Sequence, residues 1–210
     1  MRKIKWAAAA IGVVFATPAF SQWYVGGSVG QTRFDTNDSD WQAPGFASTS
    51  FDRHDTGWKL FGGYAINNYF GVEAAYVDLG KYTATIVPPV AADTGVANVK
   101  VQSWDLFLTG KLPLAANFSL TGKLGLAYNR ARMNFSSSGG TFLASDSGSD
   151  DRTAFAYGLG ASYAVTKAVA LRAEYEYLGK AGNTNNNFAN PGNTSESKPS
   201  LLSFGAQYSF

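Results

Sequence analysis

The chain has no cysteine, a single histidine, and no segment with helical periodicity. Without cysteine it can form neither a disulfide framework nor a thiolate metal site. The lone histidine, with no nucleophile motif beside it, argues against most hydrolytic active sites. After residue 21 no apolar run approaches the roughly 20 residues that a transmembrane helix needs. A membrane location, if there is one, therefore has to come from strands.

The first 21 residues have the features of an export signal. Arg2, Lys3 and Lys5 form a positive region, an apolar stretch covers residues 6–16, and small residues follow at Ala19 and Ser21. This arrangement predicts a cleaved signal peptide over residues 1–21 and a mature domain over residues 22–210. The leader holds three of the seventeen basic residues, which leaves fourteen against fifteen acidic ones. A net charge of −1 on that remainder gives no indication of a nucleic-acid-binding protein.

Alternation with a period of two recurs along the rest of the chain. In residues 169–177 the apolar positions alternate with Arg172, Glu174 and Glu176. Such alternation is typical of a β-strand, because successive side chains point to opposite faces. The same pattern predicts eight strands, over residues 23–31, 56–64, 69–79, 103–112, 118–130, 154–163, 169–177 and 201–210.

These strands present many apolar faces, and no helical segment is available to cover them. Lipid is a phase that can cover them. Within lipid every backbone group must be hydrogen-bonded inside the protein, which for strands requires a closed barrel. The predicted fold is therefore all-β, an eight-stranded antiparallel up-and-down transmembrane β-barrel in an outer membrane.

The connections alternate in length, which predicts the orientation. Three are short (65–68, 113–117 and 164–168), and four are long (32–55, 80–102, 131–153 and 179–200). Short turns of such barrels lie in the periplasm and long loops lie outside the cell. Both ends of the barrel domain are then expected in the periplasm.

The predicted strands place charged side chains on the inner face. Four are basic and four are acidic: Lys59, Lys111, Lys123 and Arg172, with Glu73, Asp105, Glu174 and Glu176. Because a buried charge is costly unless it is paired, equal numbers predict an internal ion-pair network. Two interpretations remain open, a set of ion pairs that closes the barrel and a narrow, gated path for ions.

Three segments carry a family resemblance. Residues 64–80 (YAINNYFGVEAAYVDLG), 171–177 (LRAEYEY) and 202–210 (LSFGAQYSF) resemble strands of the OmpA-like transmembrane barrel family. The resemblance implies that Glu73, Lys111 and Arg172 belong to lumen ion pairs linked to pore gating, and that a further acidic family position falls at Ser162. It also implies that Phe210 is the terminal aromatic residue read by the outer-membrane assembly machinery. Some members continue into a peptidoglycan-binding domain that the resemblance does not cover; the size is closer to single-barrel members, including small adhesion proteins.

Nine basic residues lie in or beside the predicted long loops. Those nearest strand ends are expected to contact lipopolysaccharide phosphates, which Arg and Lys can pair: Arg33, Lys81, Arg130, Arg132 and Lys180. The alternative is ordinary solubilising charge.

Two loop clusters contain residue types that occur in catalytic or metal sites. His54 can be grouped with Asp52 or Asp55 and with Ser48 or Ser50, but no nucleophile motif supports a triad. Asp146, Asp150 and Asp151 lack the spacing of a calcium-binding loop. No catalytic residue, metal or cofactor is therefore expected.

The sequence thus predicts a non-enzymatic, monomeric outer-membrane barrel that supports envelope integrity. Its partners would be outer-membrane lipids, lipopolysaccharide and the assembly machinery, with loops available for adhesion to host or other surfaces. The alternatives are a low-conductance gated pore and, less favoured, a lipid-modifying enzyme.

Overall fold

Antiparallel strands make up most of the part of the chain that the computed structural model describes, residues 22–36, 48–87, 95–137, 147–182 and 196–210. The predicted signal peptide, residues 1–21, lies outside this part, so it stays a prediction. No helix in these ranges is long and apolar enough to cross a membrane. The strands are β1 (Trp23–Thr36), β2 (Ser48–Asp52), β3 (His54–Ala65), β4 (Phe70–Val87), β5 (Gly95–Pro113), β6 (Phe118–Ser137), β7 (Ser147–Ala164), β8 (Val169–Tyr177) and β9 (Ser197–Ser209).

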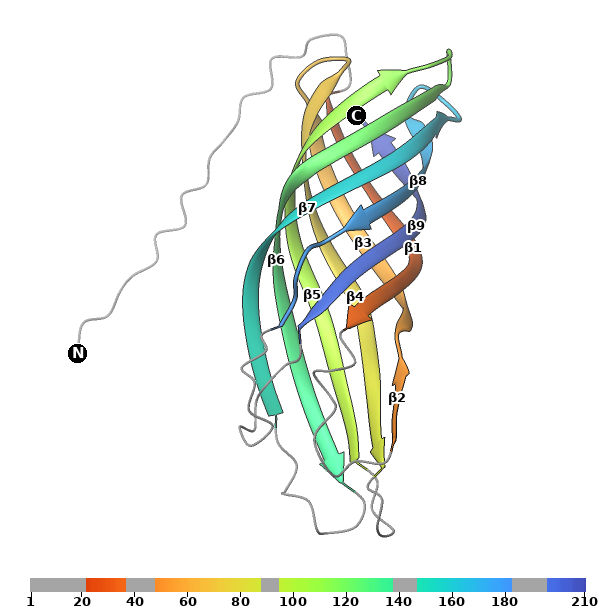
Figure 1. Cartoon of the computed structure of the whole chain (residues 1–210). Helices are drawn as coiled ribbons and strands as arrows, with labels where there is room; N and C mark the ends of the chain where they lie inside the picture. Colours follow the sequence, from red (N-terminus) through yellow and green to blue (C-terminus); the bar gives the residue numbers. More distant parts are fainter. Residues whose placement is uncertain (1–21, 37–47, 88–94, 138–146, 183–195) are drawn as a thin grey trace, which may run out of the picture.

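Eight of these strands close into a ring (Figure 1). The order runs β4-β3-β1-β9-β8-β7-β6-β5, and a pairing between β4 and β5 completes the circle. All pairings are antiparallel. The ninth strand, β2, pairs only with the far end of β4 and is separated from β3 by Arg53. The predicted eight-stranded antiparallel barrel is confirmed.

Three tight turns join β3 to β4, β5 to β6 and β7 to β8 at one end of the barrel, the upper end in Figure 1. Asn67 stabilises the first of them, because its side-chain oxygen accepts hydrogen bonds from the amides of Tyr69 and Phe70, both at 2.8 Å. β1 begins and β9 ends at the same level, where the amide of Phe210 donates to the carbonyl oxygen of Trp23. This is the end that the turn lengths assign to the periplasm.

The opposite end differs from the sequence prediction. Much of what was predicted as long loop is strand: β4 runs to Val87, β5 starts at Gly95, β6 runs to Ser137 and β7 starts at Ser147. These four strands contain 18 to 20 residues, whereas about ten cross a membrane. The wall formed by β4–β7 therefore extends well beyond the bilayer.

The two faces of the wall have different chemistry. On β5, for example, Trp104, Leu106 and Leu108 point outward and are 63–68% exposed, as a lipid-facing surface requires. The intervening residues are buried in the lumen. A small barrel of this kind has room inside only for side chains, so its function depends on what fills the lumen.

Candidate functional site

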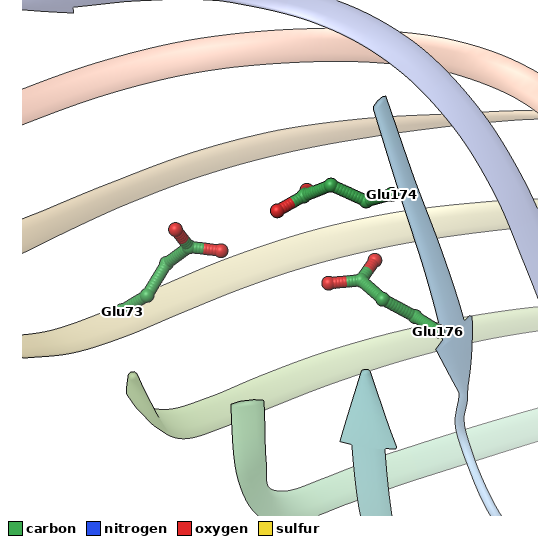
Figure 2. Close-up of side chains that lie close together, drawn as sticks. All are labelled: Glu73, Glu174 and Glu176. Carbon is green, nitrogen blue, oxygen red and sulfur yellow. The ribbon is translucent and has the colours of Figure 1, made fainter. Parts of the chain in front are cut away.

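Charged side chains from four strands meet in the middle of the lumen. β3 provides Lys59, β4 provides Glu73 and β6 provides Lys123. β8 is short, with nine residues, yet it provides three of the charged side chains: Arg172, Glu174 and Glu176. Figure 2 shows the three carboxylates converging from opposite walls of the barrel. We call these six residues the ion-pair layer.

Lys123 is the centre of the ion-pair layer. Its ammonium group lies 2.6 Å from Glu73, 2.8 Å from Glu174 and 2.9 Å from Glu176. It is almost wholly buried, so these three carboxylates replace the water that would otherwise solvate the charge. An ammonium group has three donors, and here each has a carboxylate partner.

Lys59 and Arg172 complete the pairing from other directions. The ammonium group of Lys59 lies 2.6 Å from Glu174 and 2.7 Å from Glu176. One guanidinium nitrogen of Arg172 lies 2.9 Å from Glu73, and the other contacts Glu174. Every carboxylate of the layer therefore touches at least two cations. Three positive and three negative charges balance within the layer.

Uncharged groups hold the ends of the layer. The Tyr24 hydroxyl donates to Glu73 at 3.0 Å, and Arg172 donates to Gln207 at 3.1 Å. The guanidinium of Arg172 also stacks over the ring of Phe61, 4.3 Å from its centroid, a favourable cation–π geometry. Phe61 and Tyr24 thus line the periplasmic side of the layer and help to orient Arg172.

Two glycines on β7 make room for the acidic side chains of β8. Gly158 pairs with Glu176 and Gly160 pairs with Glu174. A Cβ atom at either glycine would lie 2.9 Å from the Cγ of its partner glutamate. Glycine at these positions lets the glutamate side chains lie along the wall of a narrow lumen.

Asp105 is an acidic lumen residue that forms no ion pair with any other described residue. It is buried, and one carboxylate oxygen accepts a hydrogen bond from the neighbouring Ser103 hydroxyl. The other oxygen, Oδ2, has no hydrogen-bond partner among the described residues. The structure therefore places Asp105 in the lumen but outside the ion-pair layer.

The structure corrects the prediction that Lys111 belongs to the internal ion-pair network. Its side chain is exposed, and it forms no ion pair with any residue in the described ranges. Glu73 lies opposite Phe107 on β5, and Lys111 lies four residues further along, roughly 13 Å nearer the periplasmic end. Its cross-strand neighbour is Thr121. Ser162, where the resemblance implied an acidic residue, offers no carboxylate either.

The three glutamates are also the one group in the described part of the chain with a spacing that fits a metal ion. Their nearest oxygens lie within 4.8 Å of one another. Each already accepts charged donors from Lys59, Lys123 or Arg172. These ammonium and guanidinium groups occupy the position that a cation would need, so the arrangement is an ion-pair cluster.

A second layer closes the lumen toward the long connections, and sequence analysis did not predict it. Its members share an apolar character and complete or nearly complete burial: Phe34, Val77, Leu79, Tyr82, Val99, Val101, Leu178 and Leu201. The rings of Phe34 and Tyr82 pack at 5.2 Å. We call these residues the apolar layer. Several of them lie in segments predicted to be loops.

The five basic residues predicted at the rim fall into two groups. Arg33 lies 3.3 Å from Asp35, Lys180 lies 2.9 Å from Glu196, and Arg130 makes two 2.7 Å hydrogen bonds to Asp151. Lys81 and Arg132 are exposed and make no ion pair with a described residue. Hydrogen bonds from Arg130 lower the pKa of the Asp151 carboxyl to about 2, so this pair stays charged in all physiological conditions.

Of the remaining predicted positions, His54 and Phe210 are exposed. His54 is exposed, and its contact with Asp52 is made by its backbone amide, at 3.4 Å. The side chains of Ser48 and Ser50 and all of Asp146 lie outside the described part of the chain. Phe210 is exposed at the periplasmic end, with its ring 5.2 Å from that of Tyr208.

Known proteins resemble the chain in sequence and in fold. The model of the OmpA-like transmembrane domain family matches residues 18–210. Outer membrane protein A of Yersinia pseudotuberculosis serotype I is 32% identical over 198 residues, covering 94% of this chain and 51% of that protein. Outer membrane protein A of Klebsiella pneumoniae is 30% identical over 207 residues, covering 96% and 54%. The chain thus spans about half the length of these relatives.

Solved structures share the barrel. Ail, the attachment invasion locus protein of Yersinia pestis, superposes with a TM-score of 0.52 at 19% identity, covering 91% of this chain and 99% of Ail. Neisserial surface protein A superposes with a TM-score of 0.55 at 18% identity, covering 90% and 97%. At this identity the likeness establishes the fold. Together with the family match over residues 18–210, it shows that the chain is an outer-membrane β-barrel belonging to the family of OmpA-like transmembrane domains.

Proposed function

We propose that this protein is a non-enzymatic barrel with a permanently closed lumen, which supports the integrity of the outer membrane. The observation that carries the proposal is the presence of two consecutive seals in the lumen, the ion-pair layer and the apolar layer. Each blocks a hydrated ion for a different physical reason.

The ion-pair layer opposes passage because its contacts are shared. An ion that entered would have to displace Lys59, Lys123 or Arg172 from carboxylates at 2.6 to 2.9 Å. Removing one partner from a buried ion pair costs about 3–5 kcal/mol, because the other charge is left uncompensated. Since Lys123 touches three carboxylates, displacing it would break several contacts at once.

The apolar layer opposes passage because none of its side chains carries a charge and all but Tyr82 are wholly apolar. Phe34, Leu79 and Leu178 are fully buried in it, and an apolar constriction excludes water and the ions that water carries. Nor can a rearrangement of charged side chains open this layer.

The gated-pore alternative loses its main support in this geometry. The resemblance implied a gate in which Lys111 takes part, and Lys111 is exposed about 13 Å along its strand from the level of Glu73. The enzyme alternative also has little support, because the exposed His54 meets Asp52 only through its backbone amide.

The proposal includes three kinds of partner. Lipids surround the outward-facing belt, lipopolysaccharide meets the basic rim, and the assembly machinery reads Phe210. Adhesion would use the long connections, parts of which lie outside the described residues. We propose that these connections are separable from the structural role, because both seals are built from the barrel wall.

Envelope integrity in cells tests the structural role. A strain that lacks the protein is expected to become more sensitive to vancomycin and to detergent, and wild-type protein should restore resistance. A variant with shortened long connections should restore resistance equally while losing any attachment to cells or matrix. Unchanged sensitivity in the strain that lacks the protein would contradict the proposed function.

A further inference from the structure

The outward face of β4–β6 is arranged in rows of distinct chemistry. The row nearest the apolar belt is aromatic: Tyr76 pairs with Trp104, and Trp104 pairs with Tyr128. Trp58 joins it through Tyr76, with ring centroids 5.5 Å apart, and the rings of Tyr76 and Trp104 are 4.9 Å apart. A belt of aromatic residues marks the interface between membrane and water. The groups next to this belt on the side of the long connections lie at the level of lipid head groups.

A basic row lies four residues from the aromatic row on β5 and β6, on the side of the long connections. Lys81 pairs with Lys100, and Lys100 pairs with Arg132. All three side chains are exposed on the outer face. Directly opposed residues on neighbouring strands have Cβ atoms about 5 Å apart, and like charges at such positions repel each other. Three cations in one row are therefore unfavourable unless an anion lies between them.

A β-bulge places Lys81 in this row. The register of β4 against β5 shifts between Asp78 and Lys81. Before the shift along the chain, Val77 and Leu79 face inward, whereas after it Tyr82 is buried and Lys81 is exposed. An extra residue in a strand re-aims the side chains that follow it. The one bulge therefore turns Tyr82 into the apolar layer and Lys81 outward beside Lys100.

Specific contacts hold the bulge in this form. Gly80 has a positive φ of 77°, a conformation that glycine adopts without strain. Its amide donates to Asp78 at 3.0 Å, and the amide of Lys81 donates to Asp55 at 2.8 Å. By the alternation of β3, Asp55 lies at an inward-facing position. Its carboxylate therefore fixes the backbone of Lys81 and leaves the Lys81 ammonium group available.

Nearby carboxylates neutralise one of the three cations of the row, Lys100, and leave the other two unpaired among the described residues. Asp78 lies 3.0 Å from Lys100. Asp151 is fully engaged by Arg130, which lies two residues before Arg132 on β6. Lys81 and Arg132, on either side of Lys100, have no acidic partner in the described ranges. By contrast Arg33 and Lys180, elsewhere on the rim, each have a carboxylate within 3.3 Å.

We propose that Lys81, Lys100 and Arg132 form a site for the phosphate groups of outer-leaflet lipopolysaccharide. The phosphates would lie between the three cations, and the acyl chains would extend toward the periplasmic end over Trp104, Leu106 and Leu108. The continuity of the basic row with this apolar belt favours a phosphorylated lipid over a soluble anion. The site rests on the proposed orientation, with the long connections outside the cell.

Unfolding kinetics of the refolded protein test the site. The rate is measured in detergent micelles with bisphosphorylated lipid A, with dephosphorylated lipid A, and with inorganic pyrophosphate. Charge-assisted hydrogen bonds to phosphate are roughly twice as strong as neutral ones, so the phosphorylated lipid should slow unfolding of the wild type about tenfold or more. The other two additives should have a much smaller effect.

Two double variants separate the site from general charge. Lys81→Gln with Arg132→Gln should lose most of the slowing by bisphosphorylated lipid A, whereas Arg33→Gln with Lys180→Gln should keep it. The proposal is overturned if both variants lose the effect equally, or if dephosphorylated lipid A or pyrophosphate protects as well as the phosphorylated lipid. Because vancomycin sensitivity is a separate readout, failure here is distinguishable from failure of the structural role.

Discussion

The two layers of the lumen close the same barrel by opposite chemistry. In the ion-pair layer, Lys59, Lys123 and Arg172 are matched to Glu73, Glu174 and Glu176, contributed by four different strands. In the apolar layer, Phe34, Tyr82 and their neighbours meet without charge. The charged layer specifies which walls face one another, because each contact has a required partner. The apolar layer needs only volume and burial.

This difference determines how each layer should respond to substitution. Removing one member of the charged layer leaves uncompensated charges, so the cost is high and depends on the partners. Removing one member of the apolar layer leaves a cavity, so the cost follows the volume lost.

Lys123→Met is expected to be the most destabilising change. It would leave Glu73, Glu174 and Glu176 with fewer cations in a buried site, and we expect a loss of about 3–5 kcal/mol in the free energy of unfolding. Urea unfolding in lipid vesicles measures it. Lys111→Met is the matched control, because Lys111 is also an inward position but is exposed and unpaired among the described residues. Equal losses for the two variants would contradict the ion-pair layer.

Phe34→Ala tests the apolar layer. Phe34 is fully buried and packs on Tyr82 at 5.2 Å, so truncation should cost about 3 kcal/mol, the lower end of the range for buried phenylalanine. Phe34→Leu, which keeps most of the volume, should recover the greater part of that loss. If Phe34→Ala unfolds at the same urea concentration as the wild type, the layer is not packed as described.

Gly80→Ala tests the bulge that serves both the apolar layer and the outer face. A side chain at φ 77° is strained, and its Cβ would lie 2.5 Å from a carboxylate oxygen of Asp55. We expect a cost of about 1–2 kcal/mol. Weaker lipid A protection should accompany it, since Lys81 depends on the same bulge. Gly110→Ala, where the nearest atom to the added Cβ is 4.0 Å away, is the control and should change neither quantity.

Asp105→Asn should have the smallest effect, under about 1 kcal/mol in either direction. Among the described residues Asp105 has no cation partner, and one of its oxygens is unpaired. Asparagine keeps its size and the acceptor for Ser103. The same urea titration measures it. A loss comparable to that of Lys123→Met would show that Asp105 is a full member of the charged layer.

The sequence predicted the parts of the fold in which a strict period of two continues. Lys59, Glu73, Lys123, Arg172, Glu174 and Glu176 all lie on regular strands, so alternation alone assigns them to the inner face. Lys111 obeys the same alternation. Its exposure depends on how near it lies to the end of the barrel, and a period carries no information about depth.

The apolar layer could not be predicted in the same way. The bulge at Gly80 shifts the alternation by one residue, so Leu79 and Tyr82 both face inward although the original period would place Tyr82 outside. Phe34 is followed by a segment rich in Asp, Asn and Ser, and Val99 follows a segment that contains two prolines and Gly95; both compositions are typical of loops. Their strand pairing is set by neighbours distant in the sequence, such as Pro199 opposite Phe34.

Ion conductance across a planar lipid bilayer is the most direct test of the claim that two seals close the lumen in series. We predict no steady current through the wild type, through Lys123→Met, or through Phe34→Ala combined with Tyr82→Ala, because each retains at least one intact layer. The triple variant that opens both layers should conduct, once its folding is verified by a heat-dependent mobility shift on gels. A steady current through the wild type or through either variant with one intact layer would contradict the account.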